Sequence, residues 1–375
     1  MTNTIVCVMG TRPEAIKMAP VVRAMKAAPW VRCVVAATAQ HRDLLDQMLA
    51  RLRIAVDHDL DLMMDGQTSS GLLARMLPAL DEVLTHEQPD IVLAQGDTTS
   101  VFGAALCAFH RRIAFGHVEA GLRTSNLEHP FPEEGYRQMI ARVARWHFAP
   151  TIGAARALLA EGIAEDRIHV TGNTGIDALF QALGEMGAAP AASGRSILLT
   201  VHRRESFGAP LRDIFAAILK IVEQFPDVCV TYPVHPNPNV RDPANEMLAG
   251  HPRIRLCDPL DYFEFIDRMR RSTLILTDSG GIQEEAPALG KPVLVLRDTT
   301  ERPEALACGS SRLAGTNAKR IVEEVSTLLE TPDLLTEMSQ VRYPYGDGKA
   351  GQRILDILHG DIVAKRAGAV LPATH

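Results

Sequence analysis

Charged residues gather where predicted β-strands end, and their types suit proton transfer and charge stabilisation. The motif QGDTTS places Asp97 after one apolar run, GHVEAG places Glu119 after a second, and VHRRESFG places His202 after a third. A carboxylate or imidazole can accept and return a proton, and cationic donors stabilise negative charge that develops in a reaction. A single acidic residue at a helix start is often only a cap, and Asp97 could cap the helix that follows it.

Two glycines follow the apolar run TLILTD, which is the pattern of a strand that feeds a helix N-terminus. Ser279, Gly280 and Gly281 would present free backbone N–H groups there, and the helix dipole favours phosphate at that end. The serine or the aspartate before it can cap the helix. Glu284 and Glu285 are expected in its first turn, where Glu284 suits capping and Glu285 suits a ribose hydroxyl.

A second glycine turn, MGTRPEAIK, ends the first apolar run. Arg12 and Lys17 flank the start of the next helix. A lone surface cation is usually only solvated, but two beside a glycine turn favour a role in binding an anion. The turn has Gly10 without a G-x-G-x-x-G pattern, and no G-x-x-x-x-G-K-[ST] follows a strand, so a nicotinamide oxidoreductase and a P-loop NTPase are disfavoured.

Composition and charge exclude several classes of protein. The six cysteines form no C-x-x-C pair, which predicts free thiols in a reducing compartment, and we expect no metal and no other cofactor. A formal net charge of -6 offers no positive excess for nucleic acid or an anionic membrane. The first apolar run has no basic region before it, and no stretch is long enough to cross a bilayer. We therefore expect a cytoplasmic protein.

The hydrophobic pattern predicts the elements that position these residues. Short β-branched runs alternate with longer amphipathic ones, which indicates parallel sheets with helices on both faces. A stretch of small residues at 185–195 is interpreted as a linker. We expect an N-terminal Rossmann-like domain at 1–184 and a C-terminal one at 196–351, with a final helix at 352–375 that joins the first. A ligand would bind at the strand C-termini, in a central crevice that the two halves face.

Nine motifs together resemble those of the bacterial non-hydrolysing UDP-N-acetylglucosamine 2-epimerases, from about residue 5 to about residue 355. In order they are GTRPEAIKMAP, QGDTTS, GHVEAGLRT, PEEGYRQ, VTGNTGIDAL, HRRESFG, YPVHPNPNV, LTDSGGIQEEAPALGKPVLVLRDTTERPEA and PYGDGKA. The resemblance implies the GT-B (B-type glycosyltransferase) fold and a homodimer. It also implies reversible epimerisation of UDP-N-acetylglucosamine to UDP-N-acetylmannosamine, which supplies sugars for bacterial surface polysaccharide.

The resemblance implies roles for individual residues as well. The implied catalytic residues are Asp97, Glu119, Glu133, Arg137 and His202. The implied substrate-binding residues are Arg12, Lys17, Asp97, Glu119, His202, Phe265, Ser279, Gly280, Gly281, Glu285 and Arg302. Within this set the Ser279-Gly280-Gly281 turn would hold the diphosphate of UDP, Glu285 its ribose and Phe265 its uracil. Leu260 stands where relatives carry Gln, which removes one uracil contact, and Val201 replaces a usual small residue.

Relatives are activated by a second substrate molecule, and the resemblance places the corresponding allosteric site at Gln40, His41, Glu134 and Arg203. Asp43 and Gly66 depart from the family pattern, which has Gln and Arg at these positions. Asp43 would repel a diphosphate and Gly66 offers no cation. The second site is therefore expected to be weakened or built differently.

The implied chemistry needs proton carriers and anion stabilisers. UDP leaves C1 of the sugar while a base removes the C2 proton, which gives a glycal; UDP then returns and a proton adds to the other face of C2. The carboxylates supply the proton carriers, and the arginines, His202 and the glycine turn supply the donors. Three alternatives stay open: a GT-B glycosyltransferase that needs an acceptor, a hydrolysing epimerase, and a regulator that only binds a sugar nucleotide.

Overall fold

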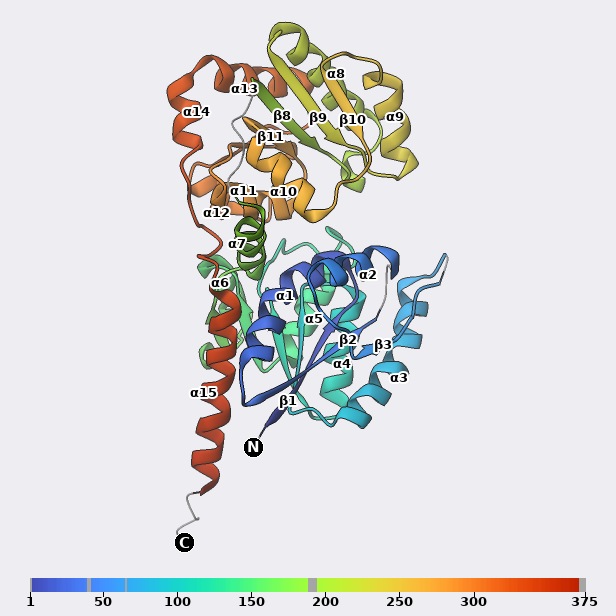
Figure 1. The fold of residues 1–375 in the computed structure, drawn as a ribbon, viewed down its shortest axis with the longest axis vertical. Coiled ribbons are helices and arrows are strands. Elements are labelled where there is room, and N and C mark those ends of the chain that lie inside the picture. Colours follow the sequence, from blue (N-terminus) through green and yellow to red (C-terminus); the bar gives the residue numbers. More distant parts are fainter. Residues whose placement is uncertain (1, 39–41, 65, 188–193, 371–375) are drawn as a thin grey trace. The chain divides into compact units, whose positions relative to one another are not determined.

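The computed structural model describes residues 2–38, 42–64, 66–187 and 194–370, with the side chains of 42–44 and 365–370 left out. The chain forms two compact units: unit 1 comprises Met1–Ala178 and Tyr345–His375, and unit 2 comprises Leu179–Pro344. Each unit is built on one parallel sheet with helices packed around it (Figure 1). The predicted fold class, two Rossmann-like α/β units, is confirmed.

The sheet of unit 1 has seven strands in the order β3-β2-β1-β4-β5-β6-β7. They are β1 (Asn3–Met9), β2 (Val31–Ala37), β3 (His58–Asp59), β4 (Ile91–Gln95), β5 (Ala114–Val118), β6 (Trp146–Ala149) and β7 (Ile168–Val170). Helices cover both faces, so a central strand is apolar on each side, and residues 5–9 are at most 1% exposed. The helices are α1 (Arg12–Ala27), α2 (Arg42–Arg51), α3 (Ser69–Glu87), α4 (Thr99–His110), α5 (Glu133–Val143), α6 (Ile152–Ala160), η1 (Glu165–Arg167), α7 (Thr174–Met186) and α15 (Ala350–Val370).

The sheet of unit 2 has six strands in the order β10-β9-β8-β11-β12-β13. They are β8 (Arg195–Thr200), β9 (Val228–Pro233), β10 (Ile254–Cys257), β11 (Leu274–Thr277), β12 (Val293–Val295) and β13 (Ser311–Leu313). The helices are η2 (Arg204–Ser206), α8 (Ala209–Gln224), α9 (Pro238–Leu248), α10 (Tyr262–Arg271), α11 (Gly280–Ala288), α12 (Pro303–Ala307), α13 (Ala318–Glu330) and α14 (Pro332–Met338). The apolar faces of α8 and α13 pack on β8, β9 and β11 to form one continuous core.

Both sheets reverse their strand order at one point, and this fixes where polar residues meet. In unit 1 the reversal lies between β1 and β4, and in unit 2 between β8 and β11. Loops that leave the carboxyl ends of these paired strands run to opposite faces of the sheet and leave a crevice, which is where open α/β sheets bind ligands. The Gly10 turn and Asp97 therefore share one switch point, and His202 and the Ser279 turn share the other.

The division between the units falls within α7, and the predicted domain limit at residue 184 lies inside that helix. The Asp177 carboxylate accepts from the backbone N–H groups of Ala350 and Gly351, at 3.1 and 2.8 Å, and thereby ties the start of α15 to unit 1. Three residues after Asp177, the Phe180 ring meets Tyr343 of unit 2 edge-on at 5.8 Å. One helix thus serves both units. Of the predicted linker 185–195, residues 188–193 lie outside the described part of the chain.

The last helix packs along the first one. A Cβ on Gly351 would lie 3.1 Å from the backbone of Pro20, so glycine is what permits α15 to approach α1 this closely. Trp30 stacks on His359 with ring centroids 4.6 Å apart, and Trp146 donates to Asp361 at 2.6 Å. Within the described residues, we find no helix whose length and apolar character would let it cross a membrane.

Candidate active site

Glu119 lies at the carboxyl end of β5 and is held there by Lys17. Lys17 Nζ donates to Glu119 Oε2 at 2.5 Å, and the side chains are only 16% and 8% exposed. The backbone of Glu119 has φ 62°, a left-handed conformation that a non-glycine residue rarely adopts. Strain of this kind persists where the surrounding structure imposes it, often at functional sites. The structure thus pairs two predicted site residues from elements far apart in the sequence.

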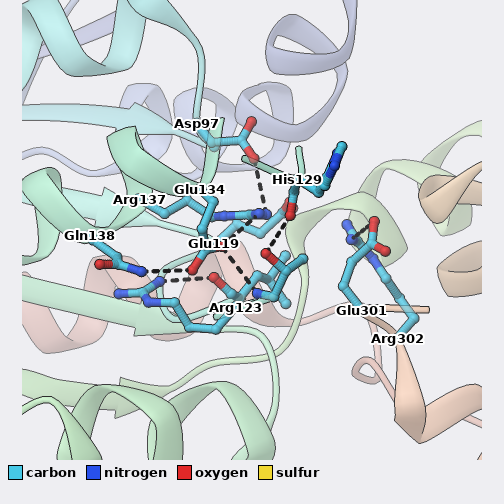
Figure 2. A network of polar contacts seen from close by, with 12 residues as sticks. Asp97, Glu119, Arg123, His129, Glu134, Arg137, Gln138, Glu301 and Arg302 are labelled. Carbon is cyan, nitrogen blue, oxygen red and sulfur yellow. Dashed lines mark hydrogen bonds and ion pairs between the residues drawn. The ribbon is translucent and has the colours of Figure 1, made fainter. Parts of the chain in front are cut away.

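Asp97 follows β4 and receives a hydrogen bond from Arg137 on α5. Arg137 Nη1 lies 3.2 Å from Asp97 Oδ2, and Nη2 lies 2.9 Å from Glu134 Oε2, so one buried guanidinium bridges two carboxylates (Figure 2). Asp97 is not the cap of α4, because the Thr98 hydroxyl accepts from the first N–H groups of that helix. The Asp97 carboxylate, about one third exposed, is therefore available for chemistry.

Glu134 is the buried anchor of this network. Its oxygens accept from the Thr124 N–H at 3.1 Å. They also accept from Gln138 Nε2 at 3.0 Å (Figure 2). Burial raises the pKa of Glu134, but these hydrogen bonds and the charges of Arg137 and Arg123 outweigh it, so the pKa lies below its usual value. Glu134, which was predicted to contact an allosteric ligand, therefore has carboxylate oxygens that already accept hydrogen bonds within unit 1.

Glu133, the first residue of α5, directly precedes Glu134 but differs from it in hydrogen bonding. Its side chain is half-buried, and its Oε2 atom is buried without a hydrogen-bond partner among the described residues. A buried carboxylate oxygen without a partner is costly unless a ligand or water satisfies it. Among the predicted site residues, Glu133 therefore has the local environment that most clearly indicates a bound ligand or water.

The structure adds Glu14, which the sequence reasoning missed. This side chain is 2% exposed, and its Oε2 accepts from the Gly10 N–H at 2.6 Å. Burial raises the pKa of Glu14 to about 7, against the opposing effects of Gly10 and of the Thr98 and Thr11 hydroxyls, and the charge of Asp97 adds to the rise. In the sequence Glu14 resembles an ordinary first-turn acid. Its burial depends on the loop after β4, which brings Thr98 and Asp97 close to it and which no local pattern reveals.

In unit 2 the aspartate before the glycine turn has a different role from the expected cap. Asp278 is fully buried, and its Oδ2 accepts from the backbone N–H groups of His202 and Arg203 at 2.9 and 2.8 Å. Ser279 occupies the N-cap position of α11, but its side chain makes no capping hydrogen bond. Asp278 thus ties the loop after β8 to the loop after β11 across the switch point.

Gly280 and Gly281 begin α11 as predicted. A Cβ on Gly280 would lie 3.0 Å from the guanidinium carbon of Arg302, whereas a Cβ on Gly281 would meet nothing within 4 Å. Gly280 thus leaves room for the close approach of Arg302, and open space lies beside Gly281. Free N–H groups at such a helix start favour an anion.

Two assignments on this helix are corrected. Glu284 and Glu285 do not lie in the first turn of α11, which holds no acidic residue, because the helix begins only at Gly280. Glu284 is not a cap: its Oε1 accepts from Arg302 Nε at 3.0 Å. Glu285, half-buried, accepts from the Tyr262 hydroxyl at 3.2 Å. Spacing alone could not place these acids, since the start of the helix depends on where β11 ends.

Glu301 forms ion pairs with three arginines, and sequence reasoning did not identify it as a site residue. Its oxygens lie 3.1 Å from Arg203 Nη2, 2.7 Å from Arg297 Nη1 and 2.8 Å from Arg302 Nη1, and its side chain is 4% exposed (Figure 2 shows the Arg302 pair). Burial raises the pKa of Glu301, but the charges of Arg302, Arg203 and Arg297 outweigh it and hold that pKa far below its usual value. The predicted ligand residue Arg302 is thus fixed by two carboxylates, Glu301 and Glu284.

The remaining predicted residues of unit 2 lie near strand ends and helix starts. The exposed His202 ring stacks on His235 at 5.4 Å, and His235 Nδ1 accepts from the Asn237 N–H at 3.1 Å. Burial, and after it the charge of His202, lowers the pKa of His235. Phe265 is half-buried on α10, and Leu260 is half-buried before that helix.

Arg12 is the first residue of α1, half-exposed, and its side chain has no ion-pair partner among the described residues. Gln40 and His41 lie outside the described residues, as does the side chain of Asp43, so the predicted allosteric site is described only at Glu134 and Arg203. All six cysteines are free.

Together, fold and site define a class: two Rossmann-like units of the GT-B type, with paired carboxylates at one switch point and a glycine helix start at the other. A family model described as UDP-N-acetylglucosamine 2-epimerase matches residues 23–359. The UDP-N-acetylglucosamine 2-epimerase of Bacillus subtilis (strain 168) is 49% identical over 358 residues, covering 94% of each chain. That of Escherichia coli (strain K12) is 46% identical over 373 residues, covering 96% of this chain and 99% of the relative.

A crystal structure of the Neisseria meningitidis UDP-GlcNAc 2-epimerase bound to UDP-GlcNAc superposes with a TM-score of 0.92 at 42% identity, covering 95% of this chain and 100% of that one. The chain belongs to the UDP-N-acetylglucosamine 2-epimerase family. The predictions of the family and of an isomerase are confirmed.

Proposed function

We propose that this protein interconverts UDP-N-acetylglucosamine and UDP-N-acetylmannosamine without releasing free sugar. Membership of the family supports the substrate. The main support for the proposed chemistry is the pair of carboxylates in unit 1. Asp97 and Glu119 follow neighbouring strands, and Arg137 and Lys17 hold them in place. Two oriented carboxylates on a rigid sheet edge suit the removal and return of one proton.

The reaction divides into an elimination and an addition. In the first, a carboxylate takes the C2 proton and the electrons of the C1–O bond leave with UDP, which gives a glycal with a C1–C2 double bond. In the second, a UDP oxygen bonds to C1 and a carboxylic acid returns a proton to the opposite face of C2. The atoms balance without an external oxidant or reductant. Asp97, Glu119 and Glu133 are the proposed proton carriers.

Unit 2 is proposed to hold the nucleotide. The Ser279 hydroxyl and the N–H groups of Gly280 and Gly281 would bind the diphosphate, because the Ser279 N–H already donates to the Thr277 hydroxyl at 2.9 Å. The Tyr262 hydroxyl would orient Glu285 for the ribose. Phe265 on α10 would pack on the uracil. Arg302, fixed by Glu284 and Glu301, would keep its charge beside the helix start where negative charge develops on UDP.

Arg12, Lys17 and His202 are proposed as the remaining contacts to the substrate, with His202 and Arg137 completing the catalytic group. Glu134 and Arg203, with Gln40 and His41, are proposed to border a second substrate molecule. A homodimer is proposed from the family resemblance, and free cysteines support a reducing compartment such as the cytoplasm. Supply of an activated sugar for surface polysaccharide would be the use of the product.

Incubation of the purified protein with UDP-N-acetylglucosamine alone tests the proposal against its alternatives. The epimer is the expected product. A glycosyltransferase without acceptor would give no new sugar nucleotide, and a hydrolysing epimerase would give UDP and free sugar. A binding protein would retain the ligand unchanged. Any of these three outcomes would contradict the proposed activity.

A further inference from the structure

The backbone of Gly96, which immediately precedes Asp97, is held by two consecutive residues of β5. The Gly96 N–H donates to the Val118 carbonyl at 3.1 Å, and the Gly96 carbonyl accepts from His117 Nε2 at 2.7 Å. Gly96 has φ 94°, which glycine adopts without strain. The peptide groups on both sides of Gly96 are therefore each fixed by a hydrogen bond to the neighbouring strand.

This contact lies directly before both carboxylates. Asp97 is the residue after Gly96, and Glu119 is the residue after Val118. The turn that carries one carboxylate is thus hydrogen-bonded to the strand end that carries the other. Because Glu119 also has left-handed backbone geometry, its position depends on the residues on each side of it.

The state of the His117 ring follows from its contacts. Nε2 faces a carbonyl oxygen and must carry a proton, whereas Nδ1 is buried without a hydrogen-bond partner among the described residues. The ring is 1% exposed, and burial lowers the pKa of His117 to about 4, against the opposing effect of Gly96. His117 is thus a neutral imidazole at working pH and serves as a fixed donor, with no direct route to solvent protons.

We propose that His117 is a positioning residue for the reaction, because its hydrogen bond to the Gly96 carbonyl sets the spacing of Asp97 relative to Glu119. The proposal rests on the proposed function, since it gives these carboxylates the proton transfer at C2. Removal of the donor lets the Gly96–Asp97 turn relax while the nucleotide residues of unit 2 are untouched. A displacement of about 1 Å at a catalytic group can cost about 10²-fold in rate.

The test compares three variants by kcat, KM, UDP affinity from calorimetry and the thermal midpoint. His117→Phe removes the donor and keeps the volume, and it should lower kcat about 10- to 100-fold with UDP affinity unchanged. His117→Gln keeps an N–H donor at a similar reach, and it should restore most of the rate. His147→Phe is the matched control: His147 lies opposite His117 on β6 and is fully buried, and its ring nitrogens donate no hydrogen bond to the Gly96–Asp97 turn. It should keep the wild-type rate.

Each alternative result contradicts the proposal. Wild-type kcat in His117→Phe, an equal loss in His117→Gln and His117→Phe, or a parallel loss of UDP affinity would show that the hydrogen bond does not position Asp97. If His117→Phe does not fold, His117→Met supplies the same comparison with a more adaptable apolar side chain. A wild-type protein without epimerase activity would instead overturn the proposed function, which separates the two failures.

Discussion

Lys17 Nζ donates to Glu119 Oε2 at 2.5 Å, and this pair joins α1 to the end of β5 across 102 residues of sequence. The Glu119 side chain is only 8% exposed, so the contact with the cation fixes where its carboxylate lies. Arg137 on α5 likewise donates to Asp97 Oδ2, at 3.2 Å. Unit 1 thus holds two carboxylates in place through two cations on different helices.

The first prediction concerns the division of labour between the units. Asp97→Asn, Glu119→Gln and Glu133→Gln should each lower turnover by roughly 10²–10⁴-fold, because each removes a group that can carry a proton. UDP affinity should change little, since the nucleotide contacts are proposed on unit 2. Glu128→Gln, an exposed acid before α5, is the control and should behave as wild type. Calorimetry with UDP and an epimerisation assay give both quantities; parallel loss of binding and turnover would refute the catalytic assignment.

Burial of Glu14 predicts a pH effect on stability. The pKa of Glu14 is about 7 in the folded protein, above the 4.5 expected when it is unfolded, so the folded state binds this proton more tightly. Its stabilising contribution is complete below pH 4.5 and is lost as the pH rises through 7. Between those limits the loss amounts to about 3 kcal/mol.

The side chain of a Glu14→Gln variant stays neutral at every pH, so the variant lacks this pH-dependent contribution to the free energy of unfolding. Its thermal midpoint relative to wild type should therefore rise from pH 5 to pH 8. Taking the difference between the two proteins cancels the titration of groups they share, His117 included. A difference between the midpoints that does not change with pH would show that Glu14 does not titrate in this range.

The three arginines around Glu301 make a further prediction. Glu301→Gln leaves their charges without the shared carboxylate in a buried setting, which should cost about 3 kcal/mol or more. Glu205→Gln is the matched control: Glu205 also pairs with Arg297, at 2.6 Å, but its side chain is 48% exposed, and such pairs contribute little. Thermal unfolding should show a clear drop for the first variant only. Equal midpoints for the two would mean that Glu301 is not required to hold the cluster.

The second substrate molecule provides a kinetic prediction. Asp43 and Gly66 replace the Gln and Arg expected from the family, so activation by UDP-N-acetylglucosamine should be weak. Initial rates with UDP-N-acetylmannosamine should then change little when a trace of the gluco epimer is added. Asp43→Gln removes the repelling charge and should increase the dependence. Strong activation in the wild-type protein would show that the departures are compensated elsewhere.

Much of the fold could be predicted because both sheets are parallel and covered on two faces. Runs such as residues 5–9 and 274–276 are apolar on both sides, so they stand out as strands without any knowledge of their partners. The residues after them could be assigned to one sheet edge for the same reason. This is why the Gly10 turn, Asp97 and the Ser279 turn could be predicted as candidate site residues from the sequence.

The parts that were missed depend on contacts between residues distant in sequence. Asp278 looked like a cap, yet its carboxylate holds the backbone of His202 and Arg203 from another strand. Glu284 looked like a first-turn acid, yet it binds Arg302 from a later loop. No local pattern distinguishes a solvated acid from one that a distant cation will bury. The division of α7 between the two units likewise depends on tertiary packing, which cannot be deduced from the amino-acid composition of the segment.

The last prediction concerns the chemical step. If protein acids break and remake the C2–H bond, the new proton comes from solvent. UDP-N-acetylglucosamine incubated with the enzyme in heavy water should gain one deuterium at C2 in both epimers at equilibrium. Because the C1–O bond also opens, the bridging and non-bridging oxygens of the β-phosphate should exchange positions.

Two comparisons make this test decisive. A nicotinamide route would return the original hydrogen as hydride, and a glycosyltransferase without acceptor would give neither exchange nor epimer. Glu119→Gln and Asp97→Asn should slow deuterium incorporation and epimer formation to the same degree, since both depend on proton transfer at C2. Mass spectrometry and NMR of the recovered sugar nucleotide measure the label. Epimer formation with full retention of the C2 hydrogen would rule out elimination and re-addition, and with it the proton-carrying role of the carboxylates that Lys17 and Arg137 hold.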